Sequence, residues 1–174
     1  MKVTRSRINH VEMYVGRGKV INGLVNRAFI DYEKLMDMKN QVLVVLRADL
    51  SPIQKKKLHR VVDEVLKSKP RYNLRGLVGH AIYRATGFFP RWLNRTGRFF
   101  CSELVYECYL KAGFKLGEHE HSEFVSPTDM FESDKLQMIF LLDGINGIKL
   151  SRKTRDSNKK IKRETKKLLL KKIK

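Results

Sequence analysis

A helix that begins at a cysteine constrains this chain more than any other feature of its sequence. Cys101 follows Phe99 and Phe100, which predict a buried extended segment, and it opens a helical pattern that runs to Ala112. Gly113 then stands where a left-handed helix cap is favoured. The start of a helix leaves backbone N–H groups unpaired and carries the positive end of the helix dipole, and both features favour a thiolate. We therefore expect Cys101 to act as a nucleophile.

A nucleophilic thiol needs a base, and an imidazole is the usual one. Of the five histidines, His10 alone lies at the start of a predicted strand with an apolar opposite face. His59 falls on the polar side of a predicted helix, and His80 lies in a segment without a clear pattern. His119 and His121 lie in a charged loop without a third ligand, which predicts no metal there. The pattern favours His10 as the base, and we expect no cofactor.

A third polar group has to hold the imidazole in position. Residues 10–15 and 19–22 alternate as two strands around Gly16-Arg17-Gly18, which predicts a β-hairpin. A three-residue turn places Asn22 on the face of His10, whereas a two-residue turn points it to the other face. Glu12 competes for this role, since it lies two residues from His10 on the same face. The sequence leaves the choice between Asn22 and Glu12 open.

The other elements follow from local signals. Ser51, Pro52 and Gln54 are typical of a capped helix start, and Pro70 ends the apolar repeat that follows. Residues 41–47 form a β-branched apolar run that predicts a buried strand. The remaining predictions are a short helix or turn at 31–38, a helix at about 74–86, a short helix after Ser126 and a strand at 136–142.

Composition limits the class of protein. With 174 residues and 42% apolar content, the chain suits one globular domain, which we place at residues 1–146. Two cysteines seven positions apart on one helix cannot reach each other, so both are expected to be free thiols in a reducing compartment. No run of eighteen apolar residues and no signal peptide is visible. These features predict a cytoplasmic or virion-associated protein without a transmembrane segment.

The net charge of +19 is concentrated near the end of the chain. Residues 147–174 hold 13 Lys and Arg against Asp156 and Glu164, a net of +11. We interpret this stretch as a basic tail that is disordered, or helical only on contact. Such a tail attracts a polyanion, either nucleic acid or an anionic membrane or polymer.

A second basic region contains aromatic residues. Phe88, Phe89 and Trp92 lie among Arg84, Arg91 and Arg95. The favoured interpretation is a lid that packs over the cleft, and the alternative is contact with bases or lipid.

Five segments carry a resemblance to a known family. They are HVEMYVGRGKVIN, VLVVLRADLSPIQKKKLHRVVDEVL, the Tyr72-Asn73 pair, FFCSELVYECYLKAG and VSPTDMF, which together span roughly Ile8 to Gly144. They resemble the permuted papain-like amidases of the NlpC superfamily, in the YaeF/YiiX-like group. The resemblance implies an α+β papain-like fold in which a small antiparallel sheet packs on the helix of the nucleophile.

The resemblance also implies roles for single residues. Cys101 would be the nucleophile, His10 the base and Asn22 the orienter, and Tyr72 would support the oxyanion. The family usually has Gly at the position of Glu12, and its orienter is often an acid, so Glu12 stays in competition with Asn22.

The expected function is that of a cysteine hydrolase, an amidase or peptidase that cleaves a peptide or peptidoglycan-like bond through a thioester. Two alternatives remain at this point. One is hydrolysis or transfer of acyl groups on lipids with the same triad, as in relatives similar to lecithin retinol acyltransferase. The other is a non-catalytic module that binds nucleic acid or belongs to a virion.

Overall fold

The description below comes from a computed structural model. It covers residue 8 and residues 10–16, 19–22, 31–34, 43–93, 97–119, 121–143 and 147–150. At residues 19, 22, 31–34, 140–143 and 147–150 it covers the backbone alone.

A three-stranded antiparallel sheet forms near the start of the chain. It contains β1 (Met13–Gly16), β2 (Lys19–Asn22) and β3 (Asp31–Lys34) in the order β1-β2-β3. The predicted hairpin is confirmed, with Met13 opposite Ile21 and a bulge next to Gly16, whose φ of +99° suits glycine. The prediction of a helix or turn at 31–38 is wrong at β3, because pairing with β2 overrides the local pattern.

The second sheet is also antiparallel and has three strands. β4 (Leu43–Ala48) pairs with β7 (Leu136–Asp143), which pairs in turn with β8 (Gly147–Leu150). Strands β4 and β7 confirm the strands predicted at residues 41–47 and 136–142. Residues 147–150, which the sequence assigned to the basic tail, instead belong to this sheet. The rest of that tail lies outside the described residues.

The helices begin where their caps predict. Helix α1 (Pro52–Lys67) carries the full capping box between Ser51 and Gln54. Helix α2 (Leu74–Thr86) starts after Asn73, whose side chain accepts a hydrogen bond from the N–H of Gly76. Helices α3 (Cys101–Lys111) and α4 (Pro127–Glu132), with the 3-10 turns η2 (Arg91–Leu93) and η3 (Ser122–Phe124), complete the described helical elements.

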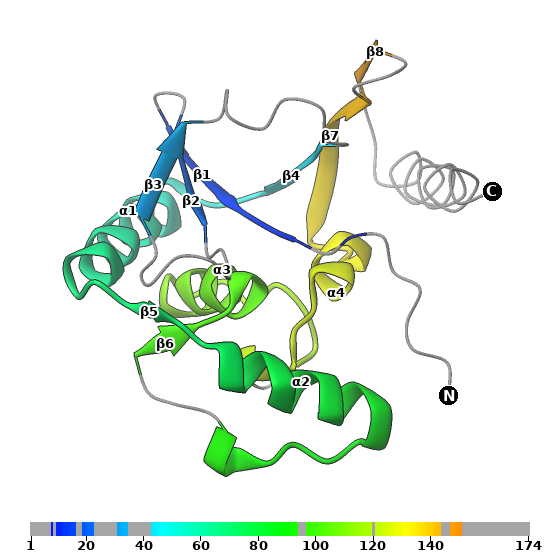
Figure 1. Ribbon diagram of the computed structural model, residues 1–174. Coiled ribbons are helices and arrows are strands. Elements are labelled where there is room, and N and C mark those ends of the chain that lie inside the picture. Colours follow the sequence, from blue (N-terminus) through cyan, green and yellow to red (C-terminus); the bar gives the residue numbers. More distant parts are fainter. Residues whose placement is uncertain are drawn as a thin grey trace.

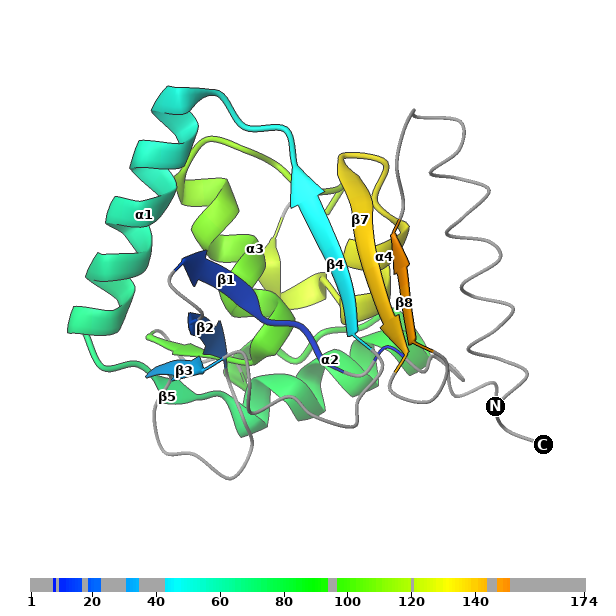
Figure 2. The ribbon, with the colours of Figure 1, turned by 90° about the horizontal axis from the view of Figure 1, so that it is seen from above.

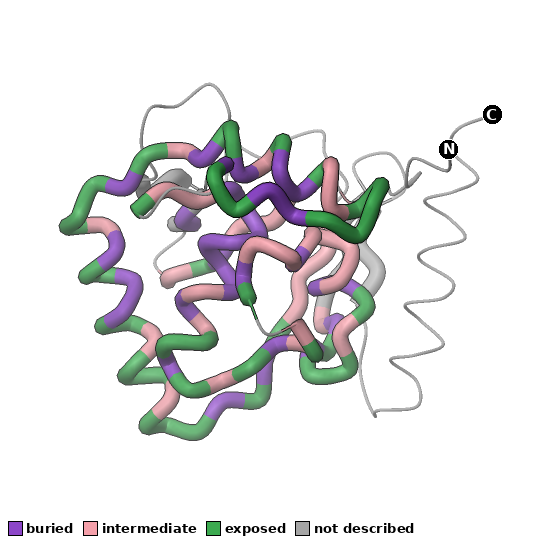
Figure 3. The backbone as a smooth tube through the Cα atoms, turned by 90° about the horizontal axis from the view of Figure 1, so that it is seen from below, coloured by how far each residue is buried: buried purple, intermediate pink, exposed green. Residues whose placement is uncertain are grey.

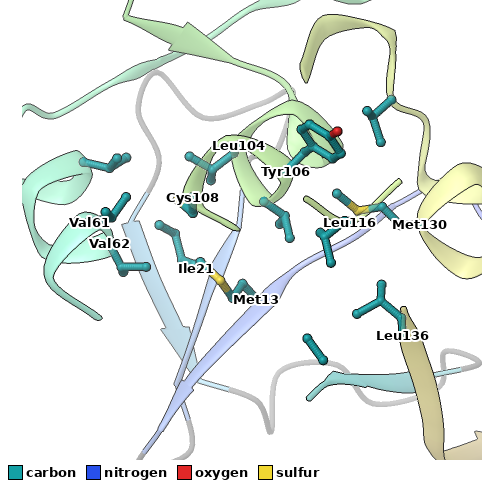
Figure 4. Close-up of a cluster of buried hydrophobic side chains, with 14 of the residues drawn as sticks. Met13, Ile21, Val61, Val62, Leu104, Tyr106, Cys108, Leu116, Met130 and Leu136 are labelled. Atoms are coloured by element: carbon teal, nitrogen blue, oxygen red, sulfur yellow. The ribbon is translucent and has the colours of Figure 1, made fainter. Parts of the chain in front are cut away.

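Helix α3 is the centre of the molecule. Figures 1 and 2 show it with α1 at one flank, the two sheets on one side and α2 on the other. Its side chains Leu104, Val105, Tyr106 and Cys108 are all buried, so the helix is covered on several faces. The core around it draws on both sheets and α1 (Figure 4), and includes Met13, Ile21, Val61, Val62, Leu116, Met130 and Leu136.

One further strand pair fixes the entrance to α3. β5 (Arg71–Tyr72) runs parallel to β6 (Arg98–Phe99), with Tyr72 opposite Phe99. The N–H of Asn73 then donates to the carbonyl of Phe99 over 3.0 Å. This pair places the starts of α2 and α3 next to each other, although 27 positions separate Leu74 from Cys101 in the sequence.

The mixed α and β architecture with small antiparallel sheets agrees with the predicted class. Sequence patterns did not predict that two separate antiparallel sheets form, or that a parallel pair joins α2 to α3. Among the described helices, none combines the length and apolar content that a membrane span needs.

The central place of α3 leads to a prediction about stability. The Leu104 side chain is 1% exposed, so we expect Leu104→Ala to lower the free energy of unfolding by about 2 to 5 kcal/mol, through lost burial and a cavity. Urea unfolding measures this change. Leu110→Ala on the same helix is the control, because Leu110 is 37% exposed, and its effect should stay below about 1 kcal/mol. Equal losses for the two variants would contradict the central position of α3.

Candidate active site

The structure brings His10 and Cys101 together. They are 91 positions apart in the sequence, yet the imidazole lies close enough to the thiol for Cys101 to raise its pKa, through hydrogen bonding and through charge. His10 lies on the segment that leads into β1, three residues before the strand itself begins at Met13. Cys101 is the first residue of α3. An imidazole from the start of the fold therefore meets a thiol at the N-terminus of the central helix.

The environment of His10 favours its charged form. Burial by itself lowers the pKa of this imidazole, because a cation loses solvation. Hydrogen bonds to Cys101 and Glu12, together with the negative charges of a thiolate and a carboxylate, outweigh burial and raise the pKa from 6.5 to about 9. At neutral pH the ring is then an imidazolium next to the sulfur. A cation beside a cysteine is one of the features that make a thiol reactive.

Glu12 is the group that contacts the ring. Its Oε1 lies 3.1 Å from Nε2 of His10, and the carboxylate is mostly shielded from solvent. Because Nε2 faces Glu12, Nδ1 is the nitrogen left for the sulfur of Cys101. Asn22, the competing orienter, ends β2 opposite Asp31, and its side chain lies outside the described part of the structure. Of the two candidates, Glu12 is the one with an observed contact to the imidazole.

The three residues after Cys101 anchor the helix start. Ser102 is fully buried and its hydroxyl donates to the carbonyl of Val125 over 2.7 Å. Glu103 accepts a hydrogen bond from the backbone N–H of Phe100 over 3.1 Å. Leu104 enters the core. The CSEL sequence thus presents one side chain to His10 and uses the next three to hold the helix in place.

Glu103 is an unusual carboxyl because it is buried at the start of a helix. Burial raises its pKa from 4.5 to about 8, and the charges of Glu123 and Glu107 add to this rise. The N–H of Phe100 and a side-chain hydrogen bond with Asn73 act in the opposite direction. Through Asn73 the carboxyl also joins the first turn of α3 to the cap of α2.

Tyr72 lies in β5 opposite Phe99, which precedes Cys101 by two residues. Burial raises the pKa of its phenol from 10.0 to about 12, and the negative charges of Cys101 and Glu103 contribute to the rise. The hydroxyl therefore keeps its proton at neutral pH and remains a hydrogen-bond donor. The structure brings His10 to Glu12 and Cys101, and it pairs Tyr72 with Phe99 just before the thiol.

The second cysteine has a different environment. Cys108 is fully buried two turns further along α3, and burial raises the pKa of its thiol from 9.0 to about 12. Both cysteines are free thiols, as the sequence predicts. Cys108 is part of the core and not of the candidate site.

Two of the other histidines, His80 and His119, have polar contacts of their own. Nδ1 of His80 lies 2.9 Å from the carbonyl of Glu123, and burial lowers its pKa. His119 lies 3.7 Å from Asp129, which also pairs with Arg84. Within the described residues, no three His, Cys, Asp or Glu side chains gather as they would around a metal ion.

Sequence reasoning missed Ser102, Glu103 and Asn73 as supports of the site. A signal existed for Glu103, because an acid three residues after a helix cap often accepts from the cap N–H. No local signal identifies the contact from Ser102 to Val125, since it joins positions 23 apart.

Comparison with protein-family models, with curated proteins and with solved structures gives no match to this chain.

The two thiols should differ strongly in reactivity. We expect iodoacetamide at pH 7 to alkylate Cys101 at least about 100-fold faster than Cys108, because the thiolate is the reactive species and burial holds Cys108 protonated. Peptide mass spectrometry of the native protein over time measures both rates. His10→Gln should slow the alkylation of Cys101 alone. Equal rates at the two cysteines would show that the His10 contact does not activate the thiol.

Proposed function

We propose that this protein is a cysteine hydrolase with Cys101 as nucleophile, His10 as acid and base, and Glu12 as the residue that orients His10. The observation that carries the proposal is the pair of contacts made by His10, one to Cys101 and one to Glu12. In acyl-transfer enzymes with a catalytic triad, the nucleophile contacts an imidazole, and a polar group holds the imidazole in position. Cys101, His10 and Glu12 have the same order of contacts. The papain-like, permuted architecture is part of the same proposal.

The first step is attack of the Cys101 thiolate on a carbonyl carbon. The sulfur forms a bond to carbon, and the carbonyl electron pair moves to oxygen as an oxyanion. A backbone N–H at the start of α3 can stabilise that charge. The N–H of Phe100 is already held by Glu103, so the N–H of Cys101 is the better placed donor. We assign Tyr72 as a second donor on the ground of the sequence resemblance, and its pKa of about 12 keeps the hydroxyl protonated at neutral pH.

Proton transfer follows from the change in charge at the sulfur. While Cys101 is a thiolate, its charge and hydrogen bond help to hold the His10 pKa near 9. Once the sulfur is bound to carbon, both effects disappear and burial again lowers the pKa. His10 then gives its proton to the leaving amine or alkoxide as the carbon–leaving group bond breaks. Formation of the thioester thus converts His10 into a stronger acid when a proton is needed.

Hydrolysis of the thioester completes the cycle. Neutral His10 takes a proton from water, the resulting hydroxide adds to the thioester carbon, and the tetrahedral intermediate expels the thiolate. Glu12 stabilises the imidazolium at each step and keeps Nδ1 directed at the sulfur. The bond we propose as substrate is an amide, in a peptide or peptidoglycan-like molecule, on the ground of the sequence resemblance.

A stoichiometric burst tests the chemistry without knowledge of the natural substrate. We expect p-nitrophenyl acetate to release nitrophenol in a rapid phase equal to the amount of protein, because acylation of Cys101 precedes slower hydrolysis. Mass spectrometry of the intact protein and of its peptides should then find one acetyl group on Cys101. Glu12→Gln should slow the burst by about tenfold or more, since the imidazolium loses a charged partner.

The control variants are Cys108→Ala, which should keep the full burst, and Cys101→Ala, which should abolish it. A burst that persists in Cys101→Ala, or an acetyl group found only at lysines, would refute the hydrolase proposal. Two further assays then distinguish the substrate classes. Cleavage of muropeptides would support the proposed amide, whereas release of fatty acid from phospholipid vesicles would indicate a lipid ester.

A further inference from the structure

The outward face of α2 is apolar, which is unusual for a helix at the molecular surface. Leu74, Val78, Ala81 and Ala85 follow each other at intervals of four, three and four residues, so they form one row along the helix. All four are exposed, and the exposed fractions of Leu74 and Val78 are 55% and 51%. The opposite face packs inward through Gly76, Gly79 and His80. We call this outward row the α2 face.

The segment after α2 adds two large exposed aromatic side chains. Phe89 and Leu93 are buried against α2, where Gly79 leaves room for them, since a Cβ there would lie 3.0 Å from Phe89. Phe88 and Trp92 are instead 67% and 76% exposed. The prediction that the aromatic residues of this segment pack as a lid is therefore wrong for these two. Figures 1 and 2 place α2 at the edge of the molecule, and Figure 3, which views the molecule from below, shows several exposed positions on that side.

The segment that carries the α2 face holds charges of one sign, although Arg84 also pairs with Asp129 over 3.5 Å. The thirty residues from Arg71 to Phe100 include six arginines and contain neither Asp nor Glu. Arg75 and Arg84 lie on α2, at either side of the apolar row, and Arg91 adjoins Trp92. All three are exposed. An apolar strip with an aromatic pair and a cationic border is complementary to the interface of an anionic bilayer.

We propose that the α2 face docks on a membrane surface rich in anionic lipid, with Trp92 and Phe88 at the level of the headgroups. The aliphatic row favours a bilayer over nucleic acid, because Leu, Val and Ala side chains offer no ring on which a base can stack. The arginines around the α2 face favour a bilayer over a second copy of the chain, because two such faces in contact would place like charges close together. The proposal goes beyond hydrolase activity, and a Cys101→Ala protein binds equally.

The chain carries its own probe for this test, since Trp92 is its single tryptophan. We expect vesicles of phosphatidylglycerol and phosphatidylcholine to shift the emission of Trp92 to the blue. Vesicles of phosphatidylcholine alone should give a weaker shift. Lipids brominated in the upper acyl chain should quench the emission. The basic C-terminal residues can also bind such vesicles, but they leave Trp92 in water and its emission unchanged.

Paired variants isolate the α2 face. Leu74→Gln with Val78→Gln should lower vesicle partitioning at least about tenfold, since each aliphatic side chain that leaves the bilayer weakens binding. Glutamine is a good helix former, so α2 should persist. The control is Ile53→Gln on α1, where the side chain is 80% exposed and away from the α2 face, and it should partition like the natural chain.

Three results would overturn the proposal. The first is vesicle binding without a change in Trp92 emission, which would assign binding to other cationic residues. The second is quenching of Trp92 by single-stranded DNA with no response to vesicles. The third is a blue-shifted emission in the absence of lipid together with a doubled particle mass, which would make the face a contact between two copies.

Discussion

The contact between His10 and Cys101 is the interaction on which the account of this protein rests. It joins the segment before β1 to the first residue of α3, so it depends on the hairpin packing against the central helix. Met13 and Ile21 of the hairpin share a core with Leu104 and Cys108 of α3. Burial of these apolar side chains fixes the distance between the two elements, and the polar contact is made at the edge of that core.

Several polar contacts hold the helix start against the rest of the fold. Ser102 binds Val125, Glu103 binds Phe100 and Asn73, and Asn73 in turn binds Phe99. All of these residues except the partly buried Phe99 are buried, where an unsatisfied polar group is costly, so each contact favours one position of the helix. A thiol and an imidazole can work together only if their separation is kept within hydrogen-bond reach. In this protein these hydrogen bonds hold the start of α3, and with it Cys101, in place.

Local signals in the sequence predicted much of the fold. Ser51 with Gln54 marked the start of α1, and the helix expected at about residues 74–86 occurs at Leu74–Thr86. The strand at 31–34 was not predicted, because its structure depends on pairing with β2 and not on its own residues. The parallel pair of Tyr72 and Phe99 was missed for the same reason, since two residues carry no periodic pattern.

The candidate site was predicted in part. Cys101 stood out through its place at a helix start, and His10 through its place at the start of a predicted strand, although β1 itself begins three residues later at Met13. The choice between Glu12 and Asn22 depends on where the imidazole lies, which a sequence pattern does not contain, and the structure shows the contact to Glu12. The α2 face begins next to this site in the sequence, because its first residue, Leu74, directly follows Tyr72 and Asn73.

The titration of His10 tests the central contact most directly. Proton NMR of the histidine ring, assigned with a His10→Gln sample, should give a pKa near 9 in the natural chain. Cys101→Ala removes the hydrogen bond and the charge of the thiolate, so the pKa should fall by about one unit or more. A pKa that is the same in both proteins would show that His10 and Cys101 do not meet in solution, and the account would be wrong.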